Sequence, residues 1–364
     1  MTKRLTLFVC IGLLLPSLSL AQQASDKFYL GKILETPNQI TEDHQGVKII
    51  YQEVKIKILD GPEKNKELML KNGGTSFLPD NRVLKKGEKI VLVKGEFMGE
   101  IEYQIIDRYR LPSMLFIFAI FFGLVIFLSR WQGLFSMLGL GISLFVLVKI
   151  VVPKIIAGGD PLTVGVLGVA LIAVFSIYTA HGFKKRTSVA VLSTLITLAL
   201  SLGIAVLFTT ISKLFGTGSE EASYLQLGSD LSLNLKGLFL AGIIIGTLGV
   251  LDDVTTSQTA AVEEIKKANN SLGFSELYKR GLSVGKEHIS SLVNTLVLAY
   301  AGASLPLFLL FYINTGQPLW LTVNGEFIAE EIIRTLVGST SLVLAVPIST
   351  LLAAYFFSKE KKEA

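Results

Sequence analysis

The sequence predicts an α-helical membrane protein that crosses the bilayer about seven times and carries a small all-β domain near its N-terminus. The 364-residue chain is 51% hydrophobic and only 17% charged, whereas soluble domains usually carry about 25% charged residues. Several windows also exceed the roughly 18 apolar residues that indicate a membrane helix. Between residues 22 and 110 the pattern changes to that of short strands. These observations favour a polytopic helical protein with one β-rich domain.

The first 21 residues have the pattern of a secretory signal. Lys3 and Arg4 precede the apolar run 5–15, and a small-x-small cleavage site ends at Ala21. We interpret residues 1–21 as a signal peptide that is removed; if it is retained, the same run becomes an N-terminal anchor helix. The only cysteine of the chain, Cys10, lies in this segment, which excludes a disulfide within the chain.

Residues 22–110 are predicted to form an extracytoplasmic β-rich domain. The stretches 53–58 and 100–105 alternate apolar residues with charged or polar ones, which is typical of strands with one buried face. Asp60 and Gly61 form a turn signal between such stretches. About five or six short strands fit into this region, so a small barrel or sandwich is expected.

Residues 111–357 are predicted to form the transmembrane domain, followed by a basic cytoplasmic tail at residues 358–364. The apolar segments lie near residues 112–129, 132–152, 161–180, 188–212, 236–252, 289–312 and 332–356. Asp160 followed by Pro161 indicates a capped helix start at the third of these segments.

The basic residues predict the orientation, because lysine and arginine concentrate in the cytoplasmic loops of membrane proteins. They gather after the third segment, after the fifth segment and at the C-terminus: Lys184, Lys185, Arg186, Lys266, Lys267, Lys279, Arg280, Lys286, Lys359, Lys361 and Lys362. The alternate connections 153–160 and 313–331 hold a single lysine between them. We therefore expect the β-rich domain outside and the C-terminus in the cytoplasm. The net charge of +5 follows largely from this asymmetry and does not indicate nucleic-acid binding.

The strongest candidate for a functional site is the polar end of the fifth apolar segment. Gly242, Gly246 and Gly249 lie on one helical face, where small residues let a neighbouring helix approach closely. Two carboxylates and a cluster of hydroxyl and amide side chains follow: Asp252, Asp253, Thr255, Thr256, Ser257 and Gln258. Ionisable groups at the edge of a bilayer are costly and usually functional. Such oxygen ligands suit a proton, Na⁺ or Mg²⁺ better than zinc. The alternative is that both carboxylates mark the membrane exit and lie in water.

The sixth apolar segment begins with a second set of candidate residues. His288 opens the segment, and Asn294 lies within its first two turns. An amide in a membrane helix is expected to face protein or water, because lipid offers it no hydrogen-bond partner. We therefore place both residues with the two aspartates in a ligand-binding or gating site at the cytoplasmic ends of the fifth and sixth helices. A structural role for His288 is the alternative. Neither the metal, the cofactor nor the bound solute or ion follows from the sequence.

These motifs resemble those of the YibE/F family of bacterial multi-pass membrane proteins. The resemblance is carried by residues 246–259, Gly-Thr-Leu-Gly-Val-Leu-Asp-Asp-Val-Thr-Thr-Ser-Gln-Thr, and by residues 285–307, which contain Asn-Thr-Leu-Val-Leu-Ala-Tyr. It covers about residues 45–357. Where the family often has Gly-Arg-Asp-His, this chain has Gly-Lys-Glu-His at residues 285–288, which keeps the charges. The resemblance implies the bacterial inner membrane and implies neither a substrate nor a chemical activity.

Three kinds of function are compatible with the sequence. The first, which we favour, is a permease or ion-coupled transporter. The second is a non-transporting assembly or sensor subunit, as a homo-oligomer or with a membrane partner, whose loop 253–288 contacts that partner. The third, an intramembrane enzyme, is disfavoured. Glu330 and Glu331 stand one residue too close to Arg334 for the Glu-Glu-x-x-x-Arg pattern of membrane CAAX-type proteases. The aspartate pair lacks the further aspartate of prenyl-transfer motifs, and three histidines on opposite sides cannot form a His-rich metal site.

Overall fold

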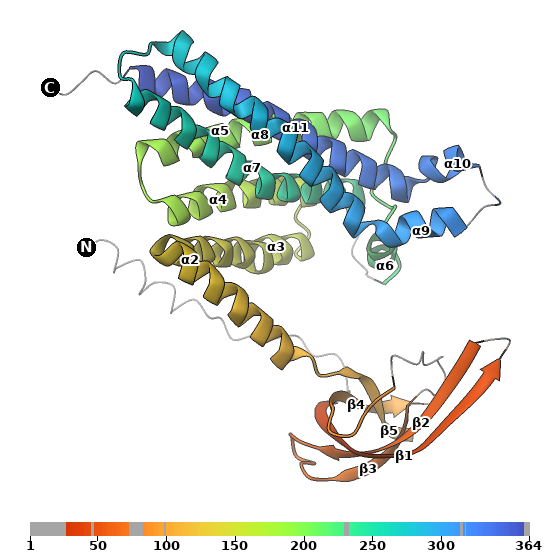
Figure 1. The fold of residues 1–364 in the computed structure, drawn as a ribbon. Coiled ribbons are helices and arrows are strands. Elements are labelled where there is room, and N and C mark those ends of the chain that lie inside the picture. The colour runs from red at the N-terminus through yellow and green to blue at the C-terminus, as the bar shows by residue number, and fades with distance from the viewer. Residues whose placement is uncertain are drawn as a thin grey trace. The chain divides into compact units, whose positions relative to one another are not determined.

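Figure 1 shows a computed structural model of the chain, which describes residues 27–44, 47–72, 83–97, 100–228, 233–313, 316 and 318–359. The chain forms two compact units, Met1–Ile120 and Phe121–Ala364. The predicted signal segment 1–21 lies outside the described residues, as does most of the predicted tail 358–364.

The first unit contains a five-stranded antiparallel sheet with the strand order β3-β2-β1-β4-β5. Its strands are β1 (Lys27–His44), β2 (Val47–Ile58), β3 (Glu67–Asn72), β4 (Lys89–Phe97) and β5 (Glu100–Arg108). Val54, Ile56 and Ile58, which alternate with charged residues in the sequence, are fully buried. The edge strands β3 and β5 come into contact, so the sheet curls into a half-barrel. The predicted β-rich fold is confirmed, whereas its side of the membrane stays a prediction.

The first apolar region forms a 46-residue helical run, Leu111–Ile156. It consists of α2 (Leu111–Val146), the π-helical turn η2 (Leu147–Val151) and α3 (Val152–Ile156). Arg130, with φ 49° and ψ −129°, breaks α2 into two parts. A straight helix of this length would measure about 69 Å, more than twice the roughly 30 Å of bilayer hydrocarbon. The break falls between the predicted segments 112–129 and 132–152.

Four more helices are long and apolar enough to cross a membrane: α4 (Pro161–His181), α5 (Lys185–Ile211), α7 (Leu235–Ala268) and α11 (Glu326–Ser358). Together with Leu111–Ile156 they make five candidate spans among the described residues. The predicted count of seven is therefore not confirmed. The short helices α6 (Glu220–Gly228) and α10 (Leu319–Asn324) lie outside these spans.

The predicted sixth segment, 289–312, is divided between two helices. α8 (Phe274–Ala303) begins well before it and ends before Ser304, and α9 (Leu305–Ile313) follows. Proline fits best in the first turn of a helix, where its missing N–H loses no hydrogen bond. Pro306 therefore explains why a new helix starts here. α8 is long enough to cross a membrane, but its first half is too polar for it to count as a candidate span.

The helices α7 and α11 form the centre of the second unit. α11 packs against α5, α7 and α8, and α7 packs against α4 and α5. Hydroxyl side chains fill part of this core: Ser193, Thr194, Thr197 and Ser201 of α5 are fully buried, and each donates a hydrogen bond to the carbonyl four residues earlier. Small hydroxyls that bond to their own helix allow close helix packing in a membrane.

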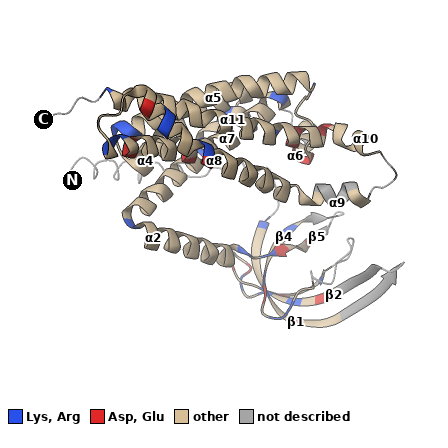
Figure 2. Cartoon of the chain, turned by 45° about the horizontal axis from the view of Figure 1, so that its top comes forward, with Lys and Arg blue, Asp and Glu red and all other residues tan. Residues whose placement is uncertain are grey.

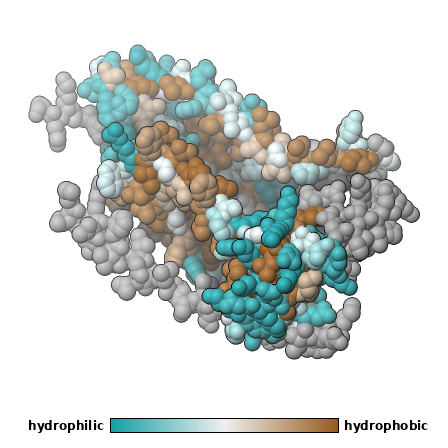
Figure 3. Space-filling model, turned by 60° about the horizontal axis from the view of Figure 1, so that its bottom comes forward, coloured by the Kyte–Doolittle hydropathy of each residue, from teal (hydrophilic) through white to brown (hydrophobic). Residues whose placement is uncertain are grey.

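The surface of the helices is apolar. Figure 2 shows Lys, Arg, Asp and Glu mainly towards the helix ends, with long uncharged stretches between. In Figure 3 the helices show broad hydrophobic areas bordered by hydrophilic ones, whereas the described surface of the sheet is largely hydrophilic. Leu167 of α4 and Phe175 of the same helix are 59% and 54% exposed. Contiguous apolar surface of this kind indicates contact with lipid.

Candidate functional site

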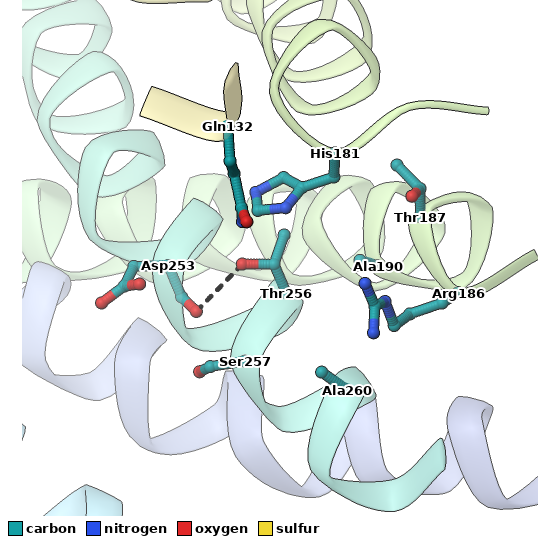
Figure 4. Close-up of a pocket in the computed structure, with 9 residues that line it drawn as sticks. All are labelled: Gln132, His181, Arg186, Thr187, Ala190, Asp253, Thr256, Ser257 and Ala260. Carbon is teal, nitrogen blue, oxygen red and sulfur yellow. Dashed lines mark hydrogen bonds between the residues drawn. The ribbon is translucent and has the colours of Figure 1, made fainter. Parts of the chain in front are cut away.

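A cavity of about 230 Å³ lies at the end of the bundle where α4 is joined to α5. Its polar lining comes from four parts of the chain (Figure 4): Gln132 after the break in α2, His181 at the end of α4, Arg186 and Thr187 at the start of α5, and Asp253, Thr256 and Ser257 on α7. The cavity thus contains three of the residues that the sequence singled out, all from α7.

A tight connection places the α4 and α5 side chains together. α4 ends at His181 because Gly182 has a φ of 76°, a left-handed conformation that side chains disfavour. α5 begins at Lys185, after a connection of only three residues. His181 and Arg186 therefore reach the same cavity from two antiparallel helices (Figure 4).

The hydroxyls of α7 are largely satisfied by their own helix. Thr256 Oγ1 donates to the carbonyl oxygens of Asp252 at 2.8 Å and of Asp253 at 3.2 Å, the second of which is drawn in Figure 4. Thr255 is fully buried behind the cavity, where its hydroxyl shares a hydrogen bond of 2.7 Å with Thr194 of α5. Thr255 therefore holds two helices together and does not face the cavity.

An ion-pair cluster lies beside the cavity. Arg186 Nη1 is 3.3 Å from Glu263 Oε2, and Lys267 Nζ is 3.4 Å from the same oxygen. These groups join α5 to the later turns of α7. The carboxylate of Asp253 makes neither a hydrogen bond nor an ion pair with the described residues. The candidate site thus contains a cation that already has an ion pair, Arg186, and a carboxylate without a partner among the described residues, that of Asp253.

Two buried polar atoms near the cavity have no hydrogen-bond partner among the described residues. One is Oγ1 of Thr187, a residue that lines the cavity and is 2% exposed. The other is Oδ1 of Asp252, which lies one turn before Thr256 on the same face of α7. A buried polar group without a partner costs about 1–3 kcal/mol, and more when it is charged. Such groups indicate places where a ligand, a proton or water completes the structure.

Gln258 has a structural position. It is 1% exposed, and its Nε2 donates to the carbonyl of Gly281 and to the hydroxyl of Thr350, both at 2.8 Å. It thereby ties α7 to α8 and α11, away from the cavity. Its Oε1 has no partner within the described residues.

The remaining predicted residues face outward from the described structure. His288 and Asn294 are exposed on α8 and do not line the cavity. Gly242, Gly246 and Gly249 are exposed on α7; only the Tyr300 hydroxyl comes within 4 Å of the Cβ position of Gly246, and nothing comes so close to the other two. The structure therefore places none of these five residues on the cavity.

Sequence reasoning did not select Gln132, Thr187 or His181 as site residues, and it assigned Arg186 to topology alone. One signal could have found the last two. The basic-residue pattern already placed the α4–α5 connection and the end of the fifth segment on the same side of the membrane. Within the described residues, no group of three or more His, Cys, Asp or Glu side chains is arranged to hold a metal ion.

A second cavity, of about 670 Å³, lies near the other ends of α5 and α11 and is lined by Lys213, Phe215, Trp320 and Glu326, among others. Its carboxylate is already engaged. Glu326 accepts hydrogen bonds from the Phe215 N–H at 2.6 Å and from the Thr217 hydroxyl at 2.8 Å. This carboxylate holds the loop after α5 in place, so the first cavity is the better candidate for a functional site.

Long apolar helices with a polar cavity at their charge-bearing ends define a multi-pass helical membrane protein. Residues 117–359, well over half of the chain, match the family model described as YibE/F-like protein, and the chain belongs to this family. The predicted resemblance is therefore confirmed for the helical region. No match was found among curated proteins or among solved structures.

Proposed function

We propose that the protein is an ion-coupled permease of the bacterial inner membrane, in which Asp252 carries a coupling proton or cation and the adjacent cavity holds the solute. The observation that carries this proposal is the buried Oδ1 of Asp252, which has no hydrogen-bond donor among the described residues. An ionised carboxylate without a partner is strongly disfavoured away from water. A proton or a bound cation removes this penalty, so occupancy of Asp252 alters the electrostatics beside the cavity.

The position of Asp252 supports coupling to the cavity. Its backbone carbonyl accepts the hydrogen bond of Thr256, a lining residue, and the next residue, Asp253, lines the cavity itself. Loading or emptying Asp252 therefore acts on atoms one helical turn or less from the solute. Ionisable residues inside membrane helices commonly mark ion pathways and proton relays.

The proposed topology has seven crossings. The break at Arg130 lets Leu111–Ile156 cross twice, and α8 with α9 forms one interrupted crossing in addition to α4, α5, α7 and α11. Interrupted helices are common where transporters bind ions. The basic connections then lie inside, with the β-rich domain outside and the C-terminus in the cytoplasm. The cavity opens on the cytoplasmic side.

Proteoliposomes that enclose a pH-sensitive dye test this function. Purified full-length protein is exposed to a pH or Na⁺ gradient in the presence of small amino acids, carboxylates or amines. We expect at least one solute to drive proton or Na⁺ movement, and Asp252→Asn to reduce the coupled rate at least about tenfold. Glu276→Gln, in an exposed pair with Arg280 on α8, is the matched control. Equal coupled flux in the wild type and Asp252→Asn would contradict the assignment.

A non-transporting assembly subunit is the second candidate, because two exposed faces are unusual for lipid contact. Asn294 lies on the outward side of α8, and Gly242, Gly246 and Gly249 lie on the outward side of α7. Amides and small residues in membrane helices usually face other helices. A homo-oligomer or a membrane partner protein would cover them.

Cysteine cross-linking tests the assembly function. Cys10→Ser supplies a background without other cysteines, into which Asn294→Cys or Gly246→Cys is introduced. A stoichiometric cross-linked complex without coupled flux would favour the assembly subunit. A monomer that transports would exclude it.

A further inference from the structure

We propose that the outer face of the β-rich sheet binds the anionic phospholipid headgroups of the leaflet that α2 enters. The binding residues are three lysines in one row across neighbouring strands: Lys57 of β2, Lys32 of β1 and Lys89 of β4. These three residues are called the lysine row below. The proposal concerns the first unit and goes beyond the proposed function, since it does not depend on whether the helical unit transports a solute.

Strand pairing places the three lysines directly opposite one another. Lys32 pairs with Lys57 on one side and with Lys89 on the other, and neighbouring strands lie about 4.8 Å apart. The residue that follows each lysine is buried in the core of the sheet: Ile33, Ile58 and Ile90. Successive side chains of a strand point to opposite faces, so the lysine row lies on the outer face. Lys32 and Lys89 are exposed there, and Lys57 is partly exposed.

The lysine row carries positive charge that the sheet does not compensate. Like charges directly opposite each other destabilise a sheet, and none of the three lysines has an ion pair among the described residues. The acid opposite Lys57 is Glu67 on β3, but its carboxylate is paired with Lys55 at 2.9 Å. Phosphate groups beside the lysine row would offset this repulsion.

Elsewhere on the outer face, opposite charges stand across from each other. Glu35 of β1 lies opposite Lys55 of β2, and Glu53 of β2 lies opposite Lys71 of β3. Among the described residues of this face, the like charges that oppose each other are those of the lysine row. Locally unfavourable arrangements of this kind are expected mainly at functional sites. The lysine row is therefore the part of this face that needs an anionic partner.

The lysine row lies close to the start of α2, which belongs to the same compact unit as the sheet. The Tyr109 N–H donates to the carbonyl of Lys89 at 2.9 Å, and α2 begins two residues later, at Leu111. Two residues span at most about 7 Å. The first turns of α2 are apolar and exposed, as at Leu115 and Phe116. The headgroup layer on each side of the hydrocarbon is about 5–8 Å thick, so a helix that enters the hydrocarbon at Leu111 brings the lysine row to headgroup depth.

The connection to α2 makes weak headgroup contacts sufficient. Each lysine near an anionic membrane surface contributes only modestly to binding. The sheet, however, is joined to a membrane helix through two residues, which keeps the local concentration of headgroups high. Lysine binds phosphate as a compact point charge without a fixed geometry. The lysine row therefore suits the mobile phosphates of a lipid surface.

Lysine acylation in nanodiscs tests this proposal. Full-length protein is reconstituted in phosphatidylcholine alone or in equal parts of phosphatidylcholine and phosphatidylglycerol, and is treated with a water-soluble acylating reagent. Mass spectrometry then follows each lysine. We expect acylation of the lysine row to be at least about threefold slower in the anionic nanodiscs, and this protection should weaken at high salt.

Lys64 is the internal control for acylation. It is exposed in the turn after β2, and this turn lies against the inner side of the sheet, since the Cβ position of Gly61 is 2.8 Å from the ring of Tyr29. Tyr29 belongs to the core of the sheet. Acylation of Lys64 should proceed at the same rate in both kinds of nanodisc.

Two variants separate lipid binding from folding. Lys32→Gln removes the central charge of the lysine row. In phosphatidylcholine it should raise the hydrogen-exchange protection of the β1 and β2 amides, because a repulsion is lost. In anionic nanodiscs it should lower the acylation protection of Lys57 and Lys89 at least about twofold. Lys71→Gln is the matched control, since Lys71 stands opposite Glu53, and it should change neither quantity in this direction.

The proposal is overturned if the lysine row is acylated equally fast in both nanodiscs, if Lys64 is protected as strongly, or if Lys32→Gln leaves the protection of the other two lysines unchanged. Soluble anions are tested in phosphatidylcholine nanodiscs with inorganic phosphate and with polyphosphate. Protection by either of these, without protection by phosphatidylglycerol, would assign the lysine row to a soluble ligand and overturn the lipid assignment. None of these measurements reads coupled flux, so the permease proposal stands or fails separately.

Discussion

Partly or fully buried carboxylates lie at both ends of the helical unit, but the ends differ in how well the described residues supply these particular carboxylates with hydrogen-bond donors. At the α5–α6 end, Glu326 accepts from the Phe215 N–H and the Thr217 hydroxyl, and Glu330 accepts from the Gly218 N–H at 3.0 Å. At the cavity end, Oδ1 of Asp252 is buried without a donor among the described residues.

This difference separates a structural carboxylate, Glu326, from Asp252, the carboxylate that we propose to be functional. A buried carboxylate with matched donors stabilises the fold and has little capacity left for a ligand. A buried carboxylate without donors lowers the stability of the free protein and keeps its full capacity for a proton or cation. Natural structures keep such locally unfavourable groups mainly at functional sites. Under the proposed function, carboxylates therefore have opposite roles at the two ends, and substitutions should have opposite effects.

The largest effect is expected where the loop after α5 touches α11. A Cβ atom on Gly218 would lie 2.8 Å from the backbone Cα and N atoms of Phe327. Backbone atoms cannot move aside as a flexible side chain can, so Gly218→Val should lower the free energy of unfolding by about 3 kcal/mol. Denaturant unfolding in detergent measures this loss. Gly242→Val is the control, since no described atom beyond its own helical turns lies within 4 Å of its Cβ position, and it should change the value by less than about 0.5 kcal/mol.

The next effect tests the engaged carboxylate itself. Glu326→Ala removes the acceptor of the Phe215 N–H and of the Thr217 hydroxyl. Charge-assisted hydrogen bonds of this kind contribute about 1.5–3 kcal/mol, so the free energy of unfolding should fall by about 2 kcal/mol. Glu326→Gln keeps an accepting oxygen and should lose less. If the two variants lose the same amount, the charge and not the hydrogen-bond geometry explains the loss.

The unpartnered carboxylate should respond with the opposite sign. Asp252→Asn removes a charge that no donor compensates, so stability should stay unchanged or rise by up to about 1 kcal/mol. Asp160→Asn is the matched control, because that carboxylate accepts from the Thr163 N–H at 2.9 Å and from Asn234 at 3.1 Å, and these bonds lower its pKa. The control should lose stability at neutral pH. A clear loss in Asp252→Asn would remove the distinction between the two ends.

The general architecture was predictable because it depends on local patterns. Period-2 alternation over residues 53–58 identified a strand whose apolar side chains are buried, and apolar runs identified α4, α5, α7 and α11. The number of crossings was less predictable. Whether the two runs on either side of Arg130 act as one helix or two depends on a single backbone conformation, which hydropathy does not encode.

The site was predictable only in part, since a polar stripe on one helix does not identify its neighbours. The α7 residues Asp253, Thr256 and Ser257 were found from their own sequence. Their cavity partners depend on the α4–α5 connection, which the sequence assigned only to topology. Asn294 lies outward because apolar residues on the opposite side of α8, Leu292 and Leu296, pack into the core. The face of an amphipathic helix that turns inward is the one whose side chains pack best into the core, and here the apolar face packs there in place of the face that carries Asn294.

The smallest effect extends the comparison to the sheet, where Glu63 is another carboxylate with matched partners. It accepts hydrogen bonds from Lys66, Lys94 and Tyr103, and these bonds, with Lys66 first, lower its pKa from 4.5 to about 2. A carboxyl whose pKa is lower in the folded state stabilises that state above the unfolded pKa. This stabilisation should be complete above about pH 5 and disappear as the pH falls from 4.5 to 2.

Hydrogen exchange of the full-length protein checks this pH dependence. Protection of the β4 and β5 amides, corrected for the intrinsic effect of pH on exchange, should decrease across that interval in the wild type. Glu63→Gln should start with lower protection at neutral pH and change less on acidification. Glu102→Gln, at an exposed position on β5, is the control and should follow the wild type. If Glu63→Gln also follows the wild type, its hydrogen bonds do not stabilise the sheet, and a carboxylate with matched donors is not sufficient to identify a structural role.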